Sequence, residues 1–439
     1  MPMPAQGSSH DEVMSQLNSA LSGDANWRAG RIFSLVYFAG EDVAQVIRDA
    51  YSAAIFTNGL GPAAFRSLKK MESEVIAMTA DLVGLPEAVG NMTSGGTESI
   101  LMALKTARDW ARAEKGITEP EVLLPVTAHP AFDKATQYLG MKRVPIPIAD
   151  DYRADVAAAK AAITPNTALV VGSAPCYPFG VIDDIPALAA LASERGIPCH
   201  VDACLGGFLL PFIERLGNTV RPWDFRVPGV ESISADLHKY GFAARGASTI
   251  MYRRKEYRRH QYFMKEDWPG GLYGSPTLAG SRPGGAVAAS WAVLNYLGEA
   301  GYKRHAQTML DTTRALTAGI NAIEGLRVVA QPDMTVFAFT SDAFDVHAVG
   351  DALAAAGWFP DRQQDPASLH IMVTPAHAEV ANEFLDAVRE AVKLVASGVQ
   401  APGGQAAIYG AMAKMDDKTP VRAFISEFID GLTKKEPAG

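Results

Sequence analysis

The sequence is poor in cysteine. Cys176, Cys199 and Cys204 are the only three among 439 residues, and no two of them have C-x-x-C spacing. Such a small, odd number argues against a disulfide framework and is typical of a reducing compartment. The segment CHVDAC also contains His200 and Asp202, but strand-like alternation would turn neighbouring side chains to opposite faces. We therefore expect neither disulfides nor a metal site.

Long apolar runs are also missing. Although 48% of the residues are hydrophobic, no stretch approaches the roughly 18 uninterrupted apolar residues that a membrane-spanning helix needs. The first ten residues, MPMPAQGSSH, lack a basic region followed by an apolar run, so no secretory signal is predicted. These absences predict a chain without a transmembrane segment and with a cytoplasmic location.

Basic residues are fewer than acidic residues in this chain. The chain has 40 Lys and Arg against 48 Asp and Glu, a formal net charge of -8. A nucleic-acid partner is not expected, because phosphate neutralisation requires a basic face. The run RRKEYRRH at 253–260 is a local exception. Such runs are usually solvated surfaces, and contact with an anionic lipid or a protein partner stays open as the alternative.

Helical and strand-like patterns alternate from residue 90 onward. Helical patterns at 94–113, 130–140, 153–163 and 185–196 separate strand-like runs at 121–127, 142–148, 167–175 and 197–203, and two further runs follow at 231–237 and 247–253. This alternation, with strands apolar on both faces, predicts an α/β fold with a mostly parallel sheet wrapped by helices. Ligands of such sheets lie beyond the carboxyl ends of the strands.

A second, smaller α/β unit follows the segment GSRPGGAVAAS. A long helical region leads to strand-like runs at 326–331, 335–340 and 369–375, with a helix near 345–356 and another after the last run. The C-terminal segment from AIYGAMA onward is expected to end in an amphipathic helix. We divide the chain into an N-terminal segment, 1–57, a large domain, 58–297, and a small C-terminal domain, 298–439.

The segment TSGGTESI at 93–100 carries the pattern of an anion site. Ser94, Gly95, Gly96 and Thr97 directly precede a helix whose first turn contains Glu98. Glycines let main-chain N–H groups close on an anion, and the helix N-terminus adds partial positive charge. A phosphate site fits this pattern, and a plain helix cap is the alternative.

Three further residues, taken together with this turn, meet the requirements of a single cofactor. Asp202 ends an apolar strand, Lys239 follows the next strand in ADLHKYGFAARG, and His129 follows the strand EVLLPVT. Taken singly, each is more often structural or on the surface. Together they match pyridoxal phosphate: the turn holds its phosphate, the acid keeps its pyridine nitrogen protonated, the lysine forms the imine and the imidazole stacks on the ring.

The motifs TSGGTES, VDACLGGF, SADLHKYG and GSRPG, in this order between about residues 27 and 430, resemble those of the bacterial sphingosine-1-phosphate lyases. SLVYFAG, TNGLGP and AIYGAMA distinguish this group from other relatives with HKYG. The group lies within the fold-type I pyridoxal-phosphate enzymes related to group II amino-acid decarboxylases. The resemblance implies a large domain with a mostly parallel seven-stranded sheet and a smaller C-terminal α/β domain.

The resemblance also implies the residues around the cofactor. Lys239 would bind it covalently, Asp202 would pair with its pyridine nitrogen, and His129 would stack on its ring. Its phosphate would lie on Gly95, Gly96, Thr97 and His238, together with Ser281 of the second subunit. A site shared in this way implies a homodimer.

The residues implied around the substrate are Tyr37, Asn58, Tyr177 and Arg245. Arg245 stands where animal relatives have lysine, and either cation can receive a phosphate. Tyr177 and Tyr37 would handle protons or bind the phosphate, and the general base is not assigned. Eukaryotic members have a histidine in NPLHP where this chain has Gly61 in NGLGP, so one polar group near the substrate phosphate is missing. They also begin with a membrane helix, which is not expected here.

The implied reaction is cleavage of a sphingoid base phosphate to a long-chain aldehyde and phosphoethanolamine. The alternative enzyme is a pyridoxal-phosphate-dependent amino-acid decarboxylase, in which Arg245 would hold a carboxylate. A third alternative, from another class, is a cofactor-binding protein without catalysis, against which the presence of both Lys239 and Asp202 argues.

Overall fold

A seven-stranded sheet forms the centre of the computed structural model, which describes residues 3–398, 406, 415 and 417–434. The strand order is β1-β7-β6-β5-β4-β2-β3. β7 is antiparallel to β1 and β6, and all the other pairs are parallel. The predicted α/β class is confirmed. The strands are β1 (Val89–Thr93), β2 (Glu121–Pro125), β3 (Lys142–Ile146), β4 (Thr167–Ser173), β5 (Cys199–Asp202), β6 (Val230–Ala235) and β7 (Ser248–Tyr252).

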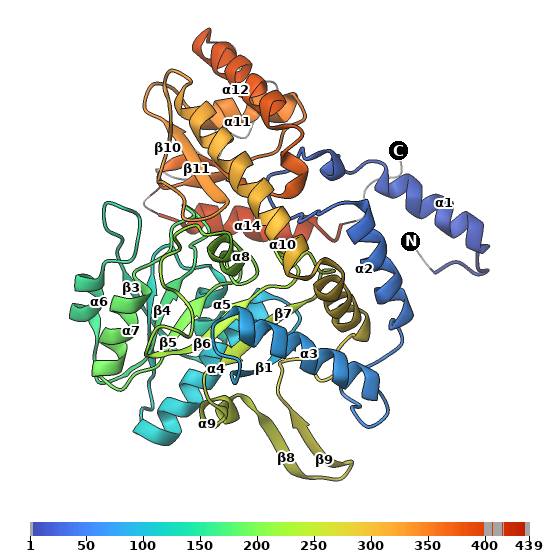
Figure 1. Ribbon diagram of the computed structural model, residues 1–439, viewed down its shortest axis with the longest axis vertical. Coiled ribbons are helices and arrows are strands. Elements are labelled where there is room, and N and C mark those ends of the chain that lie inside the picture. Colours follow the sequence, from blue (N-terminus) through green and yellow to red (C-terminus); the bar gives the residue numbers. More distant parts are fainter. Residues whose placement is uncertain (1–2, 399–405, 407–414, 416, 435–439) are drawn as a thin grey trace.

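Helices cover both faces of this sheet (Figure 1). Leu123 of β2 packs into the apolar core on one face, while Val122 and Leu124 pack into the core on the other, as alternation along a strand requires. The helices of the large unit are α3 (Arg66–Leu82), α4 (Gly96–Lys115), α5 (Ala131–Leu139), α6 (Val156–Ala162), α7 (Ile185–Glu194), α8 (Leu210–Arg215), α9 (Lys255–Arg258) and the 3-10 helix η2 (Arg259–Gln261).

The smaller unit is a four-stranded antiparallel sheet with helices, at the top of Figure 1. Its strand order is β10-β11-β13-β12. The main chain of Arg31 and Phe33 accepts hydrogen bonds from Phe359 and Met372 at 2.9 Å each, so the N-terminal segment adds to this unit. Its elements are β10 (Leu326–Val328), β11 (Val336–Ser341), α11 (Val346–Ala355), β12 (Asp361–Gln364), β13 (Ala367–Met372), η3 (Pro375–His377) and α12 (Ala381–Ala396).

A long helix, α10 (Gly284–Asn321), connects the two units. It is interrupted at Gly298, whose φ of 52° and ψ of -175° are not helical. Glycine adopts this conformation without the steric cost that other residues pay. The interruption adjoins the proposed boundary after residue 297, and the division into three segments stays a prediction.

Several elements were not predicted from the sequence. They include α1 (His10–Leu21), η1 (Trp27–Ala29), α2 (Glu41–Ala53), α8, α9, η2, η3, β1, β12 and the hairpin of β8 (Phe263–Trp268) and β9 (Gly271–Ser275), which extends from the body in Figure 1. The expected C-terminal helix is present as α14 (Thr419–Gly431), whereas AIYGAMA at 407–413 lies outside the described residues. Among the helices of the described ranges, none is long and apolar enough to cross a membrane.

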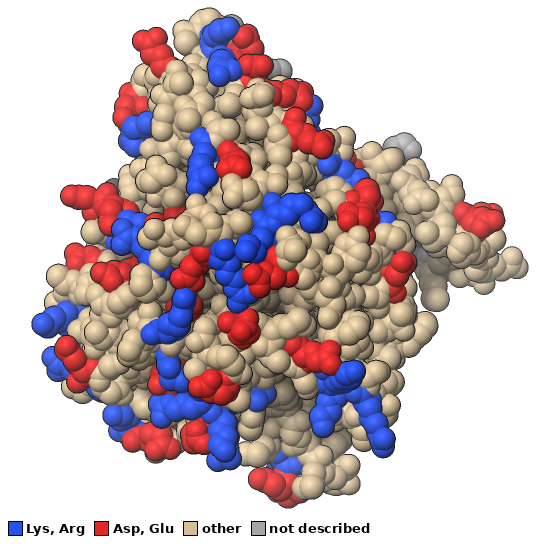
Figure 2. Space-filling model, in the orientation of Figure 1, with Lys and Arg blue, Asp and Glu red and all other residues tan. Residues whose placement is uncertain are grey.

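Charges of both signs are mixed on the face shown in Figure 2. In the basic run 253–260, Arg253 is turned inward and donates to the carbonyl oxygens of Phe225, Val227 and Val230 at 2.6–3.0 Å. Arg254 pairs with Glu231 at 2.8 Å. These two arginines of the run therefore hold the ends of β6 and β7 together.

Candidate active site

A cavity of about 310 Å³ lies beyond the carboxyl ends of the central parallel strands. The segments after β1, β2, β4, β5 and β6 all contribute to its wall, as the position of ligands in α/β sheets predicts. Among its lining residues are these that the sequence singled out: Gly95, Gly96, Thr97, His129, Tyr177, Asp202, His238 and Lys239.

Lys239 is paired with a buried acid that sequence reasoning missed. Its Nζ lies 3.0 Å from Oδ2 of Asp236, whose side chain is 1% exposed. His238 Nε2 lies 3.6 Å from the same oxygen, and neither carboxylate oxygen has a well-formed hydrogen bond from any described residue. The i, i+3 spacing of acid and lysine in ADLHK was the signal in the sequence.

In this pair, each group stabilises the charged form of the other. Burial acts to raise the pKa of Asp236, but the ammonium group of Lys239 and then the neighbouring His238 hold that pKa below its ordinary value. Burial acts to lower the pKa of Lys239, but Asp236 raises it above the ordinary value. The amine is therefore an ammonium group in the cofactor-free protein, with a buried carboxylate beside it.

Asp202 is oriented by two donors on one oxygen. The N–H of Cys204 and the hydroxyl of Ser234 both donate to its Oδ1 at 3.1 Å. Oδ2 accepts no hydrogen bond from the described residues, and the buried carboxyl group lines the cavity. A buried acid with a free oxygen suits a ring N–H donor.

The anion turn is packed closely against Asp236. Helix α4 begins at Gly96, and the first N–H groups of a helix have no partner within it. A Cβ at Gly96 would come within 2.7 Å of Asp236 Oδ2 and 3.0 Å of Cys204 Sγ, so only glycine fits. The carboxylate of Glu98 fixes the turn, because it accepts from the N–H groups of Ser94 and Leu278 at 2.7 and 2.8 Å.

The two histidines of the cavity each have one nitrogen engaged. His129 Nδ1 accepts from the N–H of Ala131 at 3.1 Å, and His238 Nδ1 accepts from the N–H of Ala247 at 3.2 Å. The neutral rings therefore carry their proton on Nε2. His129 is exposed at the cavity, and burial lowers the pKa of His238.

Tyr177 is held by an acid from the smaller unit. Its hydroxyl donates to Asp361 Oδ2 at 2.6 Å, and its ring stacks on His370 with 4.1 Å between centroids. Burial and then Asp361 raise the pKa of Tyr177, so the phenol stays neutral. Asp361 also accepts from Ser34 at 2.9 Å. No sequence signal pointed to Asp361, since the contact joins two separate units.

Four residues implied by the resemblance do not line this cavity: Tyr37, Asn58, Arg245 and Ser281. Arg245 lies close by, because its Nη1 donates to the carbonyl oxygen of His238 at 3.3 Å and its guanidinium lies 5.5 Å from the Tyr37 ring centroid. Asn58 and Ser281 contact each other instead, with 3.1 Å from Asn58 Nδ2 to Ser281 Oγ. Their roles stay predictions.

The cavity fits pyridoxal phosphate. The cavity brings together the amine of Lys239, the free carboxylate oxygen of Asp202 and the exposed imidazole of His129. It also contains the turn at Gly96, where there is no room for a side chain. Together with the sheet topology, these features define a pyridoxal-phosphate-dependent enzyme of the α/β class.

Comparison with known proteins agrees with this class. The model of the pyridoxal-dependent decarboxylase conserved domain matches residues 2–342. The sphingosine-1-phosphate lyase of Oryza sativa subsp. japonica is 44% identical over 98% of this chain and 81% of its own length, and sphingosine-1-phosphate lyase 1 of Rattus norvegicus is 43% identical over 99% and 77%. The solved sphingosine-1-phosphate lyase of Burkholderia pseudomallei superposes with a TM-score of 0.91 at 38% identity, over 99% of this chain and 98% of that one.

The chain belongs to the pyridoxal-dependent decarboxylase family and, within it, to the sphingosine-1-phosphate lyases. The predicted resemblance, fold class and cofactor are thereby confirmed.

Proposed function

We propose that this enzyme cleaves the bond between C2 and C3 of sphingoid base phosphates, releasing a long-chain aldehyde and phosphoethanolamine. The observation that carries the proposal is the cavity that joins Lys239, Asp202 and the glycine turn, in a chain 44% identical to a sphingosine-1-phosphate lyase over 98% of its length. The acidic and basic side chains that line the cavity suit this reaction.

The chemical difficulty is that the departing aldehyde leaves an electron pair on C2. Pyridoxal phosphate, when bound, supplies the ring that accepts this pair. Asp202, whose Oδ2 accepts no hydrogen bond from the described residues, would keep a proton on the ring nitrogen, and Lys239 would hold the cofactor covalently. Tyr177 is a neutral phenol that donates its one hydroxyl proton to Asp361, so it would offer the substrate an acceptor oxygen and help to position it rather than act as the base.

A homodimer with shared sites is part of the proposal. Asn58 and Ser281 contact each other and lie outside the cavity of their own chain, so they are free to act on the cavity of a second copy. Ser281 would then reach the cofactor phosphate and Asn58 the substrate. This arrangement supplies polar groups near the substrate, where this chain has Gly61 instead of a histidine.

We also propose a cytoplasmic location. The three cysteines are buried and unpaired, as is usual in a reducing compartment. Detection of the native chain in a cytosolic cell fraction would support this location, and recovery in a secreted fraction would contradict it.

The test of the activity is product analysis by mass spectrometry after the purified enzyme is mixed with sphingosine-1-phosphate and pyridoxal phosphate. A long-chain aldehyde and phosphoethanolamine are expected. Parallel incubations with glutamate, aspartate, tyrosine and tryptophan test the decarboxylase alternative, which carbon dioxide release would support. A yellow protein with no turnover on any amine would instead indicate binding without catalysis.

The guanidinium of Arg245 gives a prediction about specificity. For Arg245→Ala we expect kcat/KM for a phosphorylated sphingoid base to fall by about 10- to 100-fold, the range for losing a charge-assisted hydrogen bond. Turnover of the same amine without its phosphate should change little. Arg314→Ala is the control, since Arg314 is an exposed arginine paired with Asp311. Equal losses on both substrates would contradict a phosphate-binding role for Arg245.

A further inference from the structure

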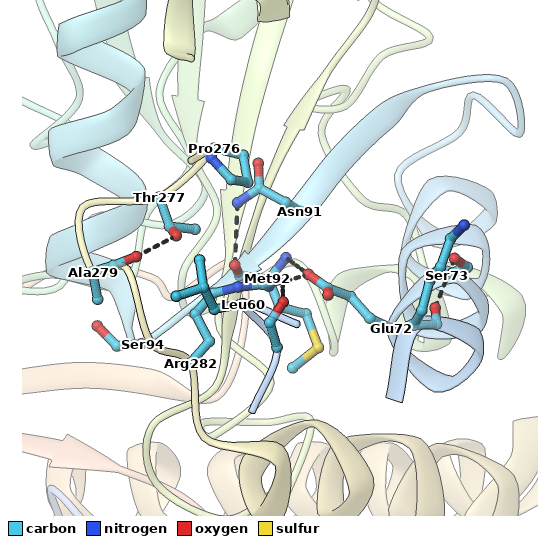
Figure 3. Close-up of polar contacts among 12 residues, drawn as sticks. Leu60, Glu72, Ser73, Asn91, Met92, Ser94, Pro276, Thr277, Ala279 and Arg282 are labelled. Carbon is cyan, nitrogen blue, oxygen red and sulfur yellow. Dashed lines mark hydrogen bonds and ion pairs between the residues drawn. The ribbon is translucent and has the colours of Figure 1, made fainter. Parts of the chain in front are cut away.

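Glu72 and Arg282 form a largely buried ion pair next to the Asn58–Ser281 contact. Glu72 Oε1 lies 2.5 Å from Arg282 Nη1, and the side chains are 16% and 17% exposed. Figure 3 shows Glu72 reaching from α3 toward Met92 and Arg282. Burying two charged groups costs free energy, so such a pair is weak evidence for stability and instead suggests a requirement for one specific geometry.

Arg282 holds the two segments that carry Asn58 and Ser281. Its N–H donates to Asn58 Oδ1 at 3.1 Å, and its Nη2 donates to the carbonyl oxygen of Gly59 at 3.3 Å. The N–H of Gly59 donates to the carbonyl oxygen of Arg282 at 2.9 Å. A Cβ at Gly59 would lie 3.2 Å from the guanidinium carbon, so the arginine packs directly on this backbone. The two segments thus form one unit, with Ser281 bonded to Asn58 at 3.1 Å.

Glu72 connects this unit to the strand that leads into the anion turn. Its Oε1 also accepts from the N–H of Met92 in β1 at 3.2 Å. β1 ends at Thr93, directly before Ser94 and the glycines of the turn. Glu72 Oε1, on α3, therefore sets the distance between the Asn58–Ser281 contact and β1.

We propose that Glu72 is a positioning residue, which acts through Arg282 to fix Asn58 and Ser281 where they complete the active site of the second subunit. This inference rests on the shared site proposed above. It predicts that Glu72 influences binding of the cofactor phosphate and turnover, although it touches neither cofactor nor substrate. A merely structural ion pair would influence stability alone.

The first experiment measures cofactor binding, kinetics and thermal unfolding for Glu72→Gln, Arg282→Ala and the double variant. Glutamine keeps the acceptor for Met92 but loses the charge. We expect kcat/KM to fall by about 10-fold or more for Glu72→Gln, and the double variant to be no worse than Arg282→Ala alone, because residues that act through one contact are not additive. Additive losses, or wild-type kinetics for Glu72→Gln, would overturn the inference.

A phosphate comparison separates positioning from general damage. Binding of pyridoxal phosphate, followed by absorbance titration, should weaken several-fold in both Glu72→Gln and Ser281→Ala, while binding of pyridoxal, which has no phosphate, should be unchanged. The matched control is Glu214→Gln, which breaks a 2.8 Å pair with Arg226 far from these segments. If Glu72→Gln weakened both ligands alike, or only lowered the melting temperature as the control does, its role would be structural.

Mixed dimers distinguish failure of this inference from failure of the proposed function. When Lys239→Ala chains are mixed with Ser281→Ala chains, one complete site forms in each mixed dimer, so about a quarter of wild-type activity should return. Glu72→Gln should complement Lys239→Ala to the same extent. If Ser281→Ala complemented Lys239→Ala but Glu72→Gln did not, the inference about Glu72 would be overturned. If neither complements while the wild type is active, the shared site is wrong, and an inactive wild type would refute the proposed reaction.

Discussion

Replacing Lys239 with alanine is expected to abolish the visible absorption of covalently bound pyridoxal phosphate and to lower turnover by at least about 10³-fold, with the oligomeric state unchanged. In the proposed assignment the amine of Lys239 attaches the cofactor, and alanine has no nucleophile. Absorbance spectra, single-turnover assays and size-exclusion chromatography measure the three effects. A variant that kept both the absorption and the turnover would refute the assignment of Lys239.

The same variant should also show a pH-dependent loss of stability in the cofactor-free state. Without the ammonium group at 3.0 Å, Asp236 loses the largest of the influences that lower its pKa, so burial, opposed only by His238 and Ser248, is expected to raise that pKa above the unfolded value. An acid whose folded pKa is raised destabilises the protein as pH rises through the unfolded pKa, so the variant should be less stable at pH 8 than at pH 5. The double variant Lys239→Ala/Asp236→Asn should lose this pH dependence and stay inactive. Thermal unfolding at both pH values would check this, and equal pH dependence in both variants would contradict the pairing.

For Asp202→Asn we expect turnover to fall by about 10²- to 10³-fold, with little change in the free energy of unfolding. The amide oxygen can keep both hydrogen bonds that Oδ1 accepts from Cys204 and Ser234, so the local structure is preserved. In the proposed assignment, the amide would not hold a proton on the ring nitrogen, so the ring would accept the electron pair left on C2 less well. Steady-state kinetics and chemical denaturation measure the two quantities.

The matched control is Asp224→Asn. Asp224 is also a buried acid, with 1% exposure, but it pairs with Arg226 away from the cavity. This variant should lose stability without losing turnover, the opposite of Asp202→Asn. If both variants lost turnover equally, the effect at Asp202 would reflect folding rather than its contact with the ring.

Local patterns predicted several of the residues that line the cavity. Strand alternation and helix periodicity depend on near neighbours in the chain, so they located the parallel strands, and the ends of those strands carried Asp202, His129 and Lys239. The turn TSGGTES was recognisable because glycine is required where Asp236 and Cys204 approach the backbone. Weaker patterns failed: β8 and β9 are a solvent-exposed hairpin without clear alternation, and β12 is only Asp361–Gln364.

By itself, then, the sequence determined the α/β class, the pyridoxal-phosphate motifs and the residues at the strand ends, because these follow from short-range periodicity and from recognisable motifs. Only the tertiary structure decided which partners those residues have. The bond from Tyr177 to Asp361 joins positions 184 apart, and the pair of Glu72 and Arg282 joins positions 210 apart. Such contacts depend on how two packed units and several loops meet in space, and no local pattern in the chain encodes the direction of a side chain toward a residue so distant.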